Sequence, residues 1–307
     1  MDRRTFIKLQ AGGLLWAAMG TPSISSVIKP AFASSYPDIA VVKGSPAAAT
    51  RKAVDTIGGI SRFVKSGQKV VIKPNMSFAR RPEDGANTHP EVVREVLIMC
   101  KEAGASKIRV LDHSLHDPEQ SLILSGIREA CDSVEKGITH HLMSDRFYKD
   151  AEIKYGKEMK SNAFMRDVLE ADVIIAVPVA KSHGSAGVSL SLKGQMGLVY
   201  DRRSMHSRYS LDVSIVDLCT LVKPALAVID ATRVLTTKGP GGPGDVIFPG
   251  EIIASADPVA ADAMAVASYK WYGRQMQPRQ VGHIREAHER GLGSMDIDNM
   301  VIKRIAL

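Results

Sequence analysis

The sequence predicts an α/β fold with a mostly parallel sheet flanked by helices and with a less regular lid or subdomain. Short apolar runs rich in Val and Ile recur along the chain, and longer segments with helical periodicity separate them. This alternation is typical of βαβ units, in which consecutive strands lie parallel. The low aromatic content, 5% of the 307 residues, also fits an Ala- and Val-rich α/β protein.

The first strand is expected at residues 38–43 (DIAVVK), and a helix follows at 46–64. A second strand, 69–72 (KVVI), runs directly into Lys73-Pro74-Asn75. Proline has no N–H for the sheet ladder and restricts the residue before it, so the strand should end here. A cation and an amide therefore stand at the mouth of a core strand.

The next helix begins at Thr88 or His89, either of which lies at its cap. Pro90 suits the first turn, and Glu91 lies beside the positive end of the helix dipole. Gly104 closes this helix.

The rest of the chain continues the alternation. Asp257 caps another helix with Pro258 at its first position, and a last helix is expected at about 279–290. The segment 114–164 is less regular and is expected to form the lid or subdomain. Further strands are predicted at 107–111, 173–177, 226–229 and 252–254.

The N-terminus has the pattern of a twin-arginine signal peptide over residues 1–33. Arg3 and Arg4 precede a weakly apolar, glycine-interrupted run, and Ala31-Phe32-Ala33 offers small residues to a signal peptidase. Cleavage after Ala33 would leave a domain of residues 34–307. We therefore expect export by the twin-arginine machinery to a periplasmic or other exported location. This route exports proteins that are already folded, often with a cofactor bound.

A membrane anchor is the alternative interpretation of this leader. The apolar run is shorter than the roughly 20 residues that a helix needs to span a bilayer. No stable membrane span is therefore expected once the leader is cleaved.

Charge and cysteines limit the function classes. The formal net charge is +7, and the leader accounts for +3 of it through four Lys or Arg residues against Asp2. The mildly basic remainder does not indicate a nucleic-acid partner. Cys100, Cys131 and Cys219 form no Cys-x-x-Cys pair, so no local iron–sulfur cysteine motif is present. Cys100 and Cys219 are expected as core residues, and a disulfide between two of the three cysteines stays open.

Polar clusters follow four predicted strands at their carboxyl ends. In a parallel sheet these ends share one edge, where α/β proteins bind ligands. Each residue alone is more often a cap or a turn, but four such clusters together favour a site. The residues are Lys73, Asn75, Asp112, His113, Lys181, His183, Asp230 and Arg233.

The segment 181–206 strengthens the expectation of an anionic ligand. Its glycines and serines offer backbone N–H groups, and Lys193, Arg202, Arg203 and His206 add positive charge. A solvated basic loop is the alternative. The turn-rich loop 239–245 could close over the same site. Neither matches a nucleotide-binding fingerprint.

Nine histidines leave a metal site open on ligand type alone. None has diagnostic spacing, since His113-x-x-His116 would need a helical turn or a special loop to bring both rings together.

Several motifs in this order resemble the domain of unknown function 362 family: VVIKPN, THPEVVREV with EAGASKIRVLDHS, ADVIIAVPVAKSH with SLSLKGQMGLV, and ASADPVAADAMAV. Some family members resemble fusions to ferredoxin-type cysteine motifs, which implies redox partners, but this chain lacks those cysteines. The resemblance implies site positions at Lys73, Asn75, Thr88, His89, Asp112, Lys181, His183, Lys193, Asp257 and Asp262. Asp257 also has a sufficient structural role as a helix cap. Asp262, inside an Ala-rich helix, would need a buried partner such as Lys73 or Lys193.

The first functional hypothesis is an enzyme that acts on a small anionic substrate or cofactor. Lys73, Lys181 and Lys193 would hold the anion and Asn75 would orient it. His183 or His89 would do acid–base work, and Asp112 would orient that histidine or bind a metal.

The second hypothesis is a non-catalytic protein that captures an anion, metal or cofactor for a partner or a maturation step. It uses the same cations but needs no general base. A structural α/β protein whose polar strand ends are only turns is a third interpretation.

Overall fold

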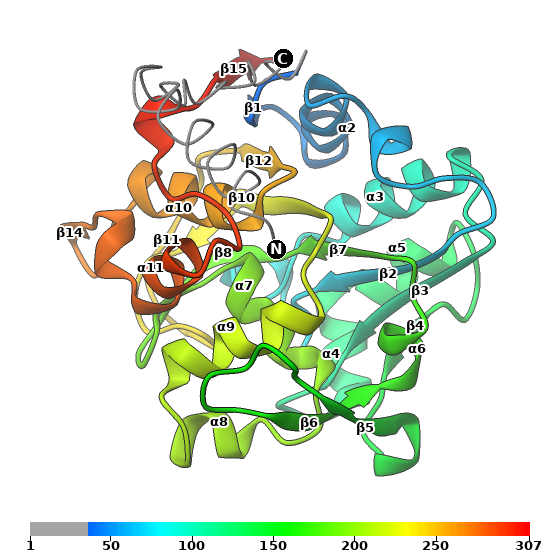
Figure 1. The fold of residues 1–307 in the computed structure, drawn as a ribbon. Helices are drawn as coiled ribbons and strands as arrows, with labels where there is room; N and C mark the ends of the chain where they lie inside the picture. Colours follow the sequence, from blue (N-terminus) through cyan, green and yellow to red (C-terminus); the bar gives the residue numbers. More distant parts are fainter. Residues whose placement is uncertain (1–35) are drawn as a thin grey trace, which may run out of the picture. The chain divides into compact units, whose positions relative to one another are not determined.

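A central eleven-stranded sheet organises residues 36–307, the part of the chain that the computed structural model describes (Figure 1). The predicted signal peptide, residues 1–33, lies outside it. Eight strands cross the sheet in the order β15-β1-β12-β10-β7-β2-β3-β4. They are β1 (Ile39–Lys43), β2 (Lys69–Pro74), β3 (Lys107–Asp112), β4 (Thr139–His141), β7 (Val173–Val177), β10 (Leu226–Leu235), β12 (Glu251–Ser255) and β15 (Ile302–Ala306).

These eight strands are parallel apart from β12, which runs antiparallel to both of its neighbours, β1 and β10. The predicted mostly parallel α/β sheet is thus confirmed. The carboxyl ends of β10, β7, β2 and β3 follow one another along one edge because each pair is parallel.

Helices cover both faces of the sheet, as Figure 1 shows. On one side lie α2 (Pro46–Thr56), α3 (Pro90–Glu102) and α5 (Ile127–Asp132). On the other lie α7 (Ser191–Gly194), α9 (Leu211–Leu221), α10 (Pro258–Ser268) and α11 (Gly282–Glu289). The shorter helices are α4 (Pro118–Ser125), α6 (Arg166–Leu169) and α8 (Arg203–Ser207).

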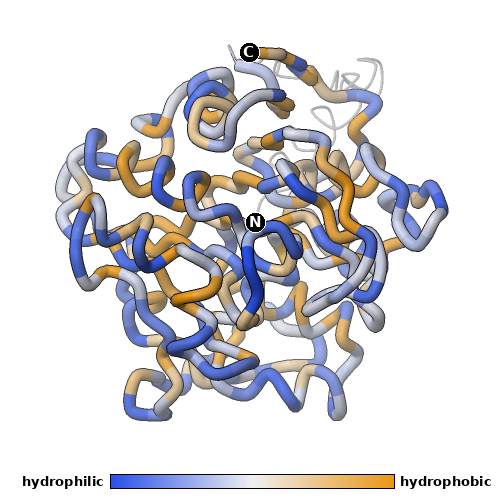
Figure 2. The backbone as a smooth tube through the Cα atoms, turned by 180° about the vertical axis from the view of Figure 1, so that it is seen from behind, coloured by the Kyte–Doolittle hydropathy of each residue, from blue (hydrophilic) through white to orange (hydrophobic). Residues whose placement is uncertain are grey.

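The sheet separates two hydrophobic cores. Val70 and Ile72 of β2 pack in the core of α2 and α3, whereas Val71 between them belongs to the opposite core. This alternation follows from the pleat, which points successive side chains to opposite faces. Because both faces are covered, strands such as β2 and β7 are apolar runs. Figure 2 shows hydrophobic stretches of this kind along the backbone.

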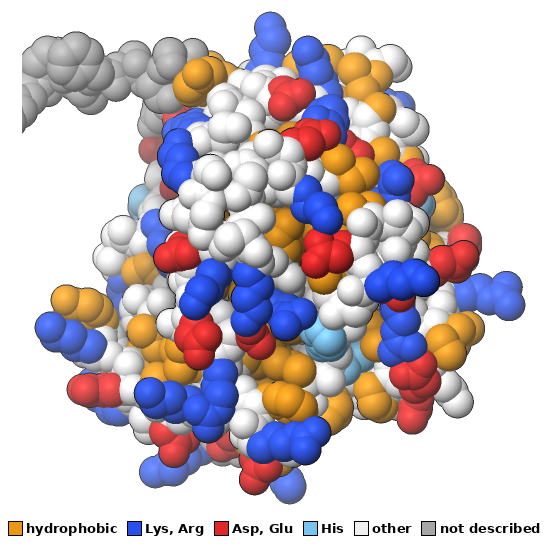
Figure 3. All heavy atoms as spheres, turned by 90° about the vertical axis from the view of Figure 1, so that its right-hand side faces the viewer, with side chains coloured by type: hydrophobic (Ala, Val, Ile, Leu, Met, Phe, Trp, Pro, Cys, Tyr) orange, Lys and Arg blue, Asp and Glu red, His pale blue; other side chains and the backbone are white. Residues whose placement is uncertain are grey.

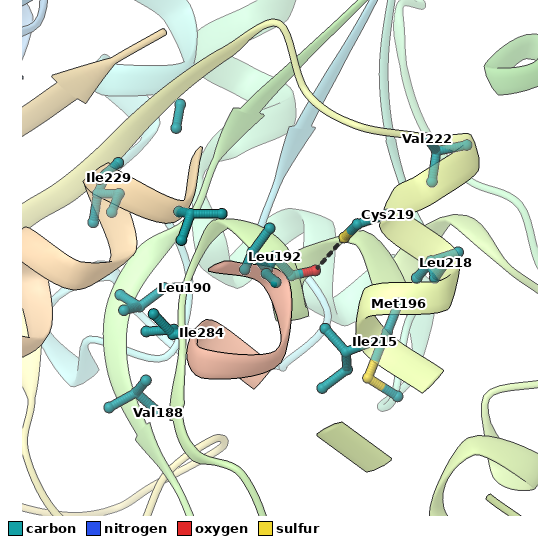
Figure 4. Packing of buried hydrophobic residues seen from close by; sticks show 14 of the residues in the cluster. Val188, Leu190, Leu192, Met196, Ile215, Leu218, Cys219, Val222, Ile229 and Ile284 are labelled. Carbon is teal, nitrogen blue, oxygen red and sulfur yellow. Dashed lines mark hydrogen bonds between the residues drawn. The ribbon is translucent and has the colours of Figure 1, made fainter. Parts of the chain in front are cut away.

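The short helix α7 is held inside the second core. Figure 4 shows Leu192 between α9 and Ile284 of α11, and the thiol of Cys219 donates a hydrogen bond to the Leu192 carbonyl at 3.6 Å. Cys219 and Cys100 are buried free thiols in apolar surroundings, as predicted, and Cys131 is also a buried free thiol. The open alternative of a disulfide is therefore wrong.

Some boundaries differ from the predicted ones. The helix expected at 46–64 ends at Thr56, because Gly58 and Gly59 take positive φ values of 109° and 75° and only a 3-10 turn follows at Ile60–Arg62. The last helix is shorter than 279–290, since residues Pro278–Gln280 form a separate 3-10 turn. The strand predicted at 226–229 runs on to Leu235.

The segment 114–164 contains α4, α5, β4 and a hairpin. β4 adds to the edge of the main sheet beside β3, whereas β5 (Tyr148–Glu152) and β6 (Ser161–Met165) form their own two-stranded sheet.

A strand that the sequence did not predict extends the sheet at the carboxyl end of β10. β8 (Val179–His183) begins directly after Pro178 and pairs with the distal part of β10, while β9 (Gly187–Ser189) folds back antiparallel to it. All five residues of β8 are buried.

The remaining short strands are β11 (Val246–Ile247), β13 (Lys270–Trp271) and β14 (Arg274–Gln275). The other 3-10 turns are Pro82–Asp84, Asp145–Phe147, Gln195–Leu198 and Ile297–Asn299.

Charges of both signs share the surface that Figure 3 shows, where Lys and Arg side chains lie among Asp and Glu and some histidines lie near the centre. Ion pairs such as Lys107–Asp167 at 2.6 Å and Lys101–Glu135 at 2.7 Å are partly exposed and contribute little stability each. No helix within residues 36–307 is both long and apolar enough to cross a bilayer.

A buried carboxylate on α9 connects this helix to two other segments of the chain. Asp217 accepts hydrogen bonds from the backbone N–H groups of residues 157–159 at 2.6–2.9 Å. Its Oδ1 also pairs with Arg290 at the end of α11, at 2.7 Å.

We expect Asp217→Asn to lower the free energy of unfolding by about 2–3 kcal/mol, because the largely buried Arg290 loses its nearest carboxylate and backbone N–H groups lose an acceptor. Thermal denaturation followed by circular dichroism measures this change. Asp150→Asn is the matched control, since Asp150 is exposed on β5 and should leave the melting temperature unchanged. Equal melting temperatures for both variants would contradict the role of Asp217.

Candidate functional site

A cavity of about 380 Å³ opens beyond the carboxyl ends of β2 and β3 and beside β8. We call it the strand-end pocket. Five cationic side chains and two carboxylates line it: Lys73, Lys181, Lys193, Arg202, Arg203, Asp112 and Asp201. Six of the predicted site residues therefore meet there, namely Lys73, Asn75, Asp112, Lys181, His183 and Lys193.

Lys73 and Asp112 form a buried ion pair at the base of the pocket. The Lys73 Nζ lies 3.1 Å from Asp112 Oδ1 and donates to the Pro74 carbonyl at 2.5 Å. Each side chain is 1% exposed. The pair joins the ends of adjacent strands, because β2 carries the lysine and β3 the aspartate.

Both oxygens of Asp112 have several partners. Oδ2 accepts from the Met76 N–H at 3.1 Å and from Ser77 Oγ at 2.6 Å, and Oδ1 accepts from the His113 N–H at 2.9 Å. Burial would raise the pKa of Asp112, but the charge of Lys73 and these hydrogen bonds lower it below its usual range. Asp112 is thus an ionised anchor of the loop after β2 rather than a free acid.

Gly197 packs directly on this ion pair. A Cβ atom at this position would lie 2.1 Å from Asp112 Oδ1 and 2.9 Å from Lys73 Nζ. Only glycine therefore allows the turn after α7 to approach so closely.

Lys181 lies on the wall of the pocket with no carboxylate partner among residues 36–307. Its Nζ donates to the Ala86 carbonyl at 2.5 Å and stands 4.7 Å from the centre of the Phe78 ring. The residue is only 2% exposed. Burial, followed by the charges of Lys193 and Lys73, lowers the pKa of Lys181 to about 7 even though Asp112 opposes the shift.

Lys193 is a second buried cation without an ion-pair partner in the described part of the chain. Its Nζ donates to Met196 Sδ at 3.6 Å, and a thioether sulfur is a weak acceptor. Burial, Arg202 and Lys73 together lower the pKa of Lys193 to about 8.

Arg202 completes the cationic wall. Its guanidinium donates to the carbonyls of His113 at 3.0 Å and Ser114 at 3.2 Å. These bonds connect the segment after the 3-10 turn Gln195–Leu198 to the end of β3. Tyr200 stacks on the His113 ring with centroids 5.9 Å apart and also lines the pocket.

His183 lies in the pocket, but its geometry favours a hydrogen-bond donor over the predicted general base. Nδ1 accepts from the N–H groups of Ser185 and Ala186, both at 3.2 Å. The neutral ring therefore carries its proton on Nε2. Burial and the charges of Lys193 and His206 lower the pKa of His183 to about 3.

Asn75, which was predicted to orient the anion, bonds to the backbone at the start of β8. Its Oδ1 accepts from the Val179 N–H at 3.1 Å, which links the end of β2 to the start of β8. Because the oxygen is occupied, the Nδ2 amide group is the part of Asn75 that can donate to a ligand in the pocket.

His89 and Asp262, both predicted as site residues, do not line the pocket. His89 caps α3, where its Nδ1 accepts from the Glu91 N–H at 3.2 Å. Asp262 accepts from the N–H groups of Ser191 and Leu192 at 2.8 and 3.0 Å, so it holds the start of α7 and has backbone partners instead of a lysine. Burial raises the pKa of Asp262 to about 7.

The fourth strand-end cluster is also structural. Asp230 pairs with Arg233 at 2.9 Å and accepts from the His89 N–H at 2.7 Å. Arg233 in turn donates to the carbonyls of Pro82 and Asn87, so the pair fixes the loop between β2 and α3.

The turn-rich loop 239–245 borders the pocket through Pro240. The Gly239 N–H donates to Ser182 Oγ at 3.0 Å, and Arg80 Nε donates to the Gly241 carbonyl at 3.2 Å. A Cβ on Gly239 would lie 2.0 Å from the Ser182 carbonyl oxygen, which explains the glycine.

The donor arrangement for a metal is sparse. Within residues 36–307, no three His, Cys, Asp or Glu side chains gather in the way that a protein metal site requires. His113 instead packs between Tyr148 and Tyr200, and His116 lies edge-on to Phe78.

Sequence reasoning missed the aromatic part of the pocket. Phe78 and Ser77 follow the Lys-Pro-Asn motif by a few residues, and Tyr200 precedes the Arg202-Arg203 pair. Proximity to the predicted clusters was the signal that could have identified them.

Comparisons with known proteins give distant relatives. The chain is 25% identical over 228 residues to the Thylakoid-associated protein sll1697 of Synechocystis sp., which covers 71% of this chain and 68% of the relative. A solved lactate racemase apoprotein from Thermoanaerobacterium thermosaccharolyticum is 13% identical with a TM-score of 0.46, covering 71% of this chain and 54% of that one. A solved protein from Thermotoga maritima is 11% identical with a TM-score of 0.38, covering 70% and 57%. The chain thus spans little more than half the length of these two structures.

A family model covers the pocket itself. The model described as "Domain of unknown function (DUF362)" matches residues 70–267, a stretch that contains all the residues that line the strand-end pocket. The match extends over more than half of the chain, and the protein therefore belongs to the DUF362 family.

Proposed function

We propose that this protein is an enzyme that binds a small organic anion, a carboxylate or a phosphate ester, in the strand-end pocket. The observation that carries the proposal is the pair of buried ammonium groups, Lys181 and Lys193, which lack a carboxylate partner among the described residues. Burial of an unpaired charge is costly, so such groups are usually paired or bind a ligand.

The surroundings of the two lysines support this choice of ligand. Arg202 and Arg203 add further positive charge, and the Nε2–H of His183 adds a neutral donor beside them. A volume of about 380 Å³ lies in the range of small-molecule sites. An anion bound there would gain several charge-assisted hydrogen bonds in a site of low dielectric constant.

A non-catalytic binding or maturation protein is the second candidate. The locked ring of His183 favours it, because the histidine that was expected as a general base already uses Nδ1 as an acceptor. The enzyme remains our first choice because Lys181, with a pKa of about 7, offers a proton acceptor in the same pocket.

We also propose that the protein works outside the cytoplasm after export by the twin-arginine route. The leader residues Arg3 and Arg4, the glycine-interrupted apolar run and the Ala31-Phe32-Ala33 segment support this location.

Anion affinity should fall as the pH rises through about 7 to 8. Lys181 and Lys193 are charged below their pKa values of about 7 and 8 and neutral above them, and the anion binds the charged forms. Above this range the affinity should decrease by about tenfold per pH unit for each proton taken up. Isothermal titration with glutarate and with inorganic phosphate at several pH values measures the slope. An affinity independent of pH would exclude these lysines from the site.

We expect Lys181→Met and Lys193→Met each to weaken anion binding by at least about tenfold, which corresponds to the loss of one charge-assisted contact. The exposed Lys149 of β5 provides the control Lys149→Met, which should bind like the wild type. Unchanged binding in both pocket variants would contradict the proposed function.

The same substitutions should stabilise the ligand-free protein. The folded pKa of Lys181 lies below the ordinary value of 10.5, so this group costs stability below about pH 7, and the cost disappears as the pH rises towards 10.5. Lys181→Met removes this cost, so the free energy of unfolding of the ligand-free protein should rise by about 1 kcal/mol at neutral pH. Residues that serve function often lower stability in this way. A lower melting temperature than that of the wild type would show that the ammonium is well satisfied in the free protein.

Export is tested with the double substitution Arg3→Lys and Arg4→Lys. We expect the variant to stay in the cytoplasm at full length, whereas Lys8→Arg, which keeps the charge outside the pair, should be exported and processed. Cell fractionation and the mass of the secreted chain give the readout, and export of the double variant would exclude the twin-arginine route.

A further inference from the structure

We propose that Lys181 captures the carbonyl group of an aldehyde or 2-oxo acid as an imine inside the strand-end pocket. The inference rests on the proposed function, because the anionic part of such a ligand would be held by that site. It narrows the ligand to a compound that carries both an anionic group and a carbonyl.

The position of Lys181 suits an amine nucleophile. The side chain is fixed at one end of the pocket by Ala86 and Phe78, and among residues 36–307 it has no carboxylate that would hold it as an ammonium ion. Within that part of the chain its nitrogen makes one hydrogen bond, to the Ala86 carbonyl, so a lone pair can face the cavity. Burial next to other cations is a known way to activate a lysine amine.

The charged groups that face Lys181 come from three elements. Lys73 of β2 and Lys193 of α7 disfavour its positive charge, whereas Asp112 of β3 favours it. Asp112 is already paired with Lys73 at 3.1 Å, so much of its charge is neutralised. At neutral pH a substantial fraction of Lys181 is therefore the neutral amine.

The other two lysines of the pocket are less suitable. Lys73 is already paired with Asp112 at 3.1 Å and donates to the Pro74 carbonyl, so its nitrogen is not free to attack although burial lowers its pKa. Lys193 lies near Arg202, and the two charges together suit the carboxylate or phosphate of the ligand.

The sequence of β8 places a hydrogen-bond donor beside the amine. Lys181 and His183 are two residues apart on one strand, so both side chains point to the same face, whereas Ser182 points to the other. Consistent with this, Ser182 contacts Gly239 while both of its neighbours line the pocket. The Nε2–H of His183 can therefore donate to the carbonyl oxygen as negative charge develops on it.

The reaction needs no oxidant, reductant or co-reactant. The nitrogen lone pair of Lys181 forms a bond to the carbonyl carbon, and the π electrons move to the oxygen, which takes up a proton lost by the nitrogen. The C–O bond of the resulting carbinolamine then breaks, and the nitrogen loses its second proton as the C=N bond forms. The hydroxyl group leaves with that proton as water. One amine and one carbonyl thus give one imine and one water.

The test uses the full-length chain with 2-oxoglutarate and with glutarate, which differ only in the carbonyl oxygen. Cyanoborohydride is added at neutral pH to reduce any imine, and intact mass followed by peptide mapping locates the adduct. We expect one adduct per chain on Lys181 with 2-oxoglutarate and none with glutarate. The extent of labelling at Lys181 should exceed that at any exposed lysine by at least roughly tenfold, because most exposed lysines stay protonated at this pH.

Two variants separate imine formation from loss of the fold. Lys181→Arg keeps the positive charge but cannot form an imine, so it should bind glutarate and give no adduct, whereas Lys149→Met should label like the wild type. Circular dichroism shows whether each variant is folded.

Three results would overturn the inference. If both acids bind but no adduct forms on Lys181, imine capture is wrong and the proposed anion site stands. If neither acid binds, imine capture and the proposed function are both wrong for this pocket. If adducts spread over exposed lysines in the wild type, or persist in Lys181→Arg, the labelling is unspecific and the assignment to Lys181 is wrong.

Discussion

The buried ion pair between Lys73 and Asp112 is the interaction on which the strand-end edge of this protein depends. Pro74 ends the ladder of β2, and the chain must then turn without leaving polar groups unpaired. Asp112 meets this need, since it accepts hydrogen bonds from Met76 and Ser77 while it neutralises Lys73. The turn that contains Gly197 can then pack onto a closed, charge-balanced base. Loss of either charge would leave its partner buried and unpaired, which commonly costs several kcal/mol.

The wall of the pocket above this base is electrostatically different. Its cations Lys181 and Lys193 have weak or single acceptors, so the ligand-free protein carries an unfavourable field that an anion would relieve. The carboxylates of the supporting elements are paired: Asp262 accepts from backbone N–H groups of α7, and Asp230 pairs with Arg233 to hold the loop before α3. The two buried lysines that lack a carboxylate partner among residues 36–307 thus both line the cavity.

Much of this arrangement could be predicted from the sequence. Periodicity and proline identified the ends of β2 and β3, and parallel strands bring such ends together, which is why Lys73, Asp112 and Lys181 were found. Asp230 and Asp262 lie outside the pocket because they accept from backbone N–H groups distant in the sequence, which a residue pattern does not show. His89 takes the helix-cap role that was predicted for it or Thr88. The position of the proton on the His183 ring depends on the backbone N–H of Ala186, three residues further on. The strand β15 forms only by pairing with β1, which is distant in the sequence.

The use of lysine, and not arginine, on the pocket wall bears on the chemistry. An arginine would keep its charge whether or not an anion is bound, and Arg202, which lines the same pocket, is such a residue. A buried lysine costs the same desolvation but can become a neutral amine. An anion bound close to Lys181 would raise its pKa and restore the ammonium form, which cannot attack a carbonyl. A simple anion can contact both lysines, but a ligand that also presents a carbonyl to Lys181 must keep its anionic group nearer to Lys193 and Arg202.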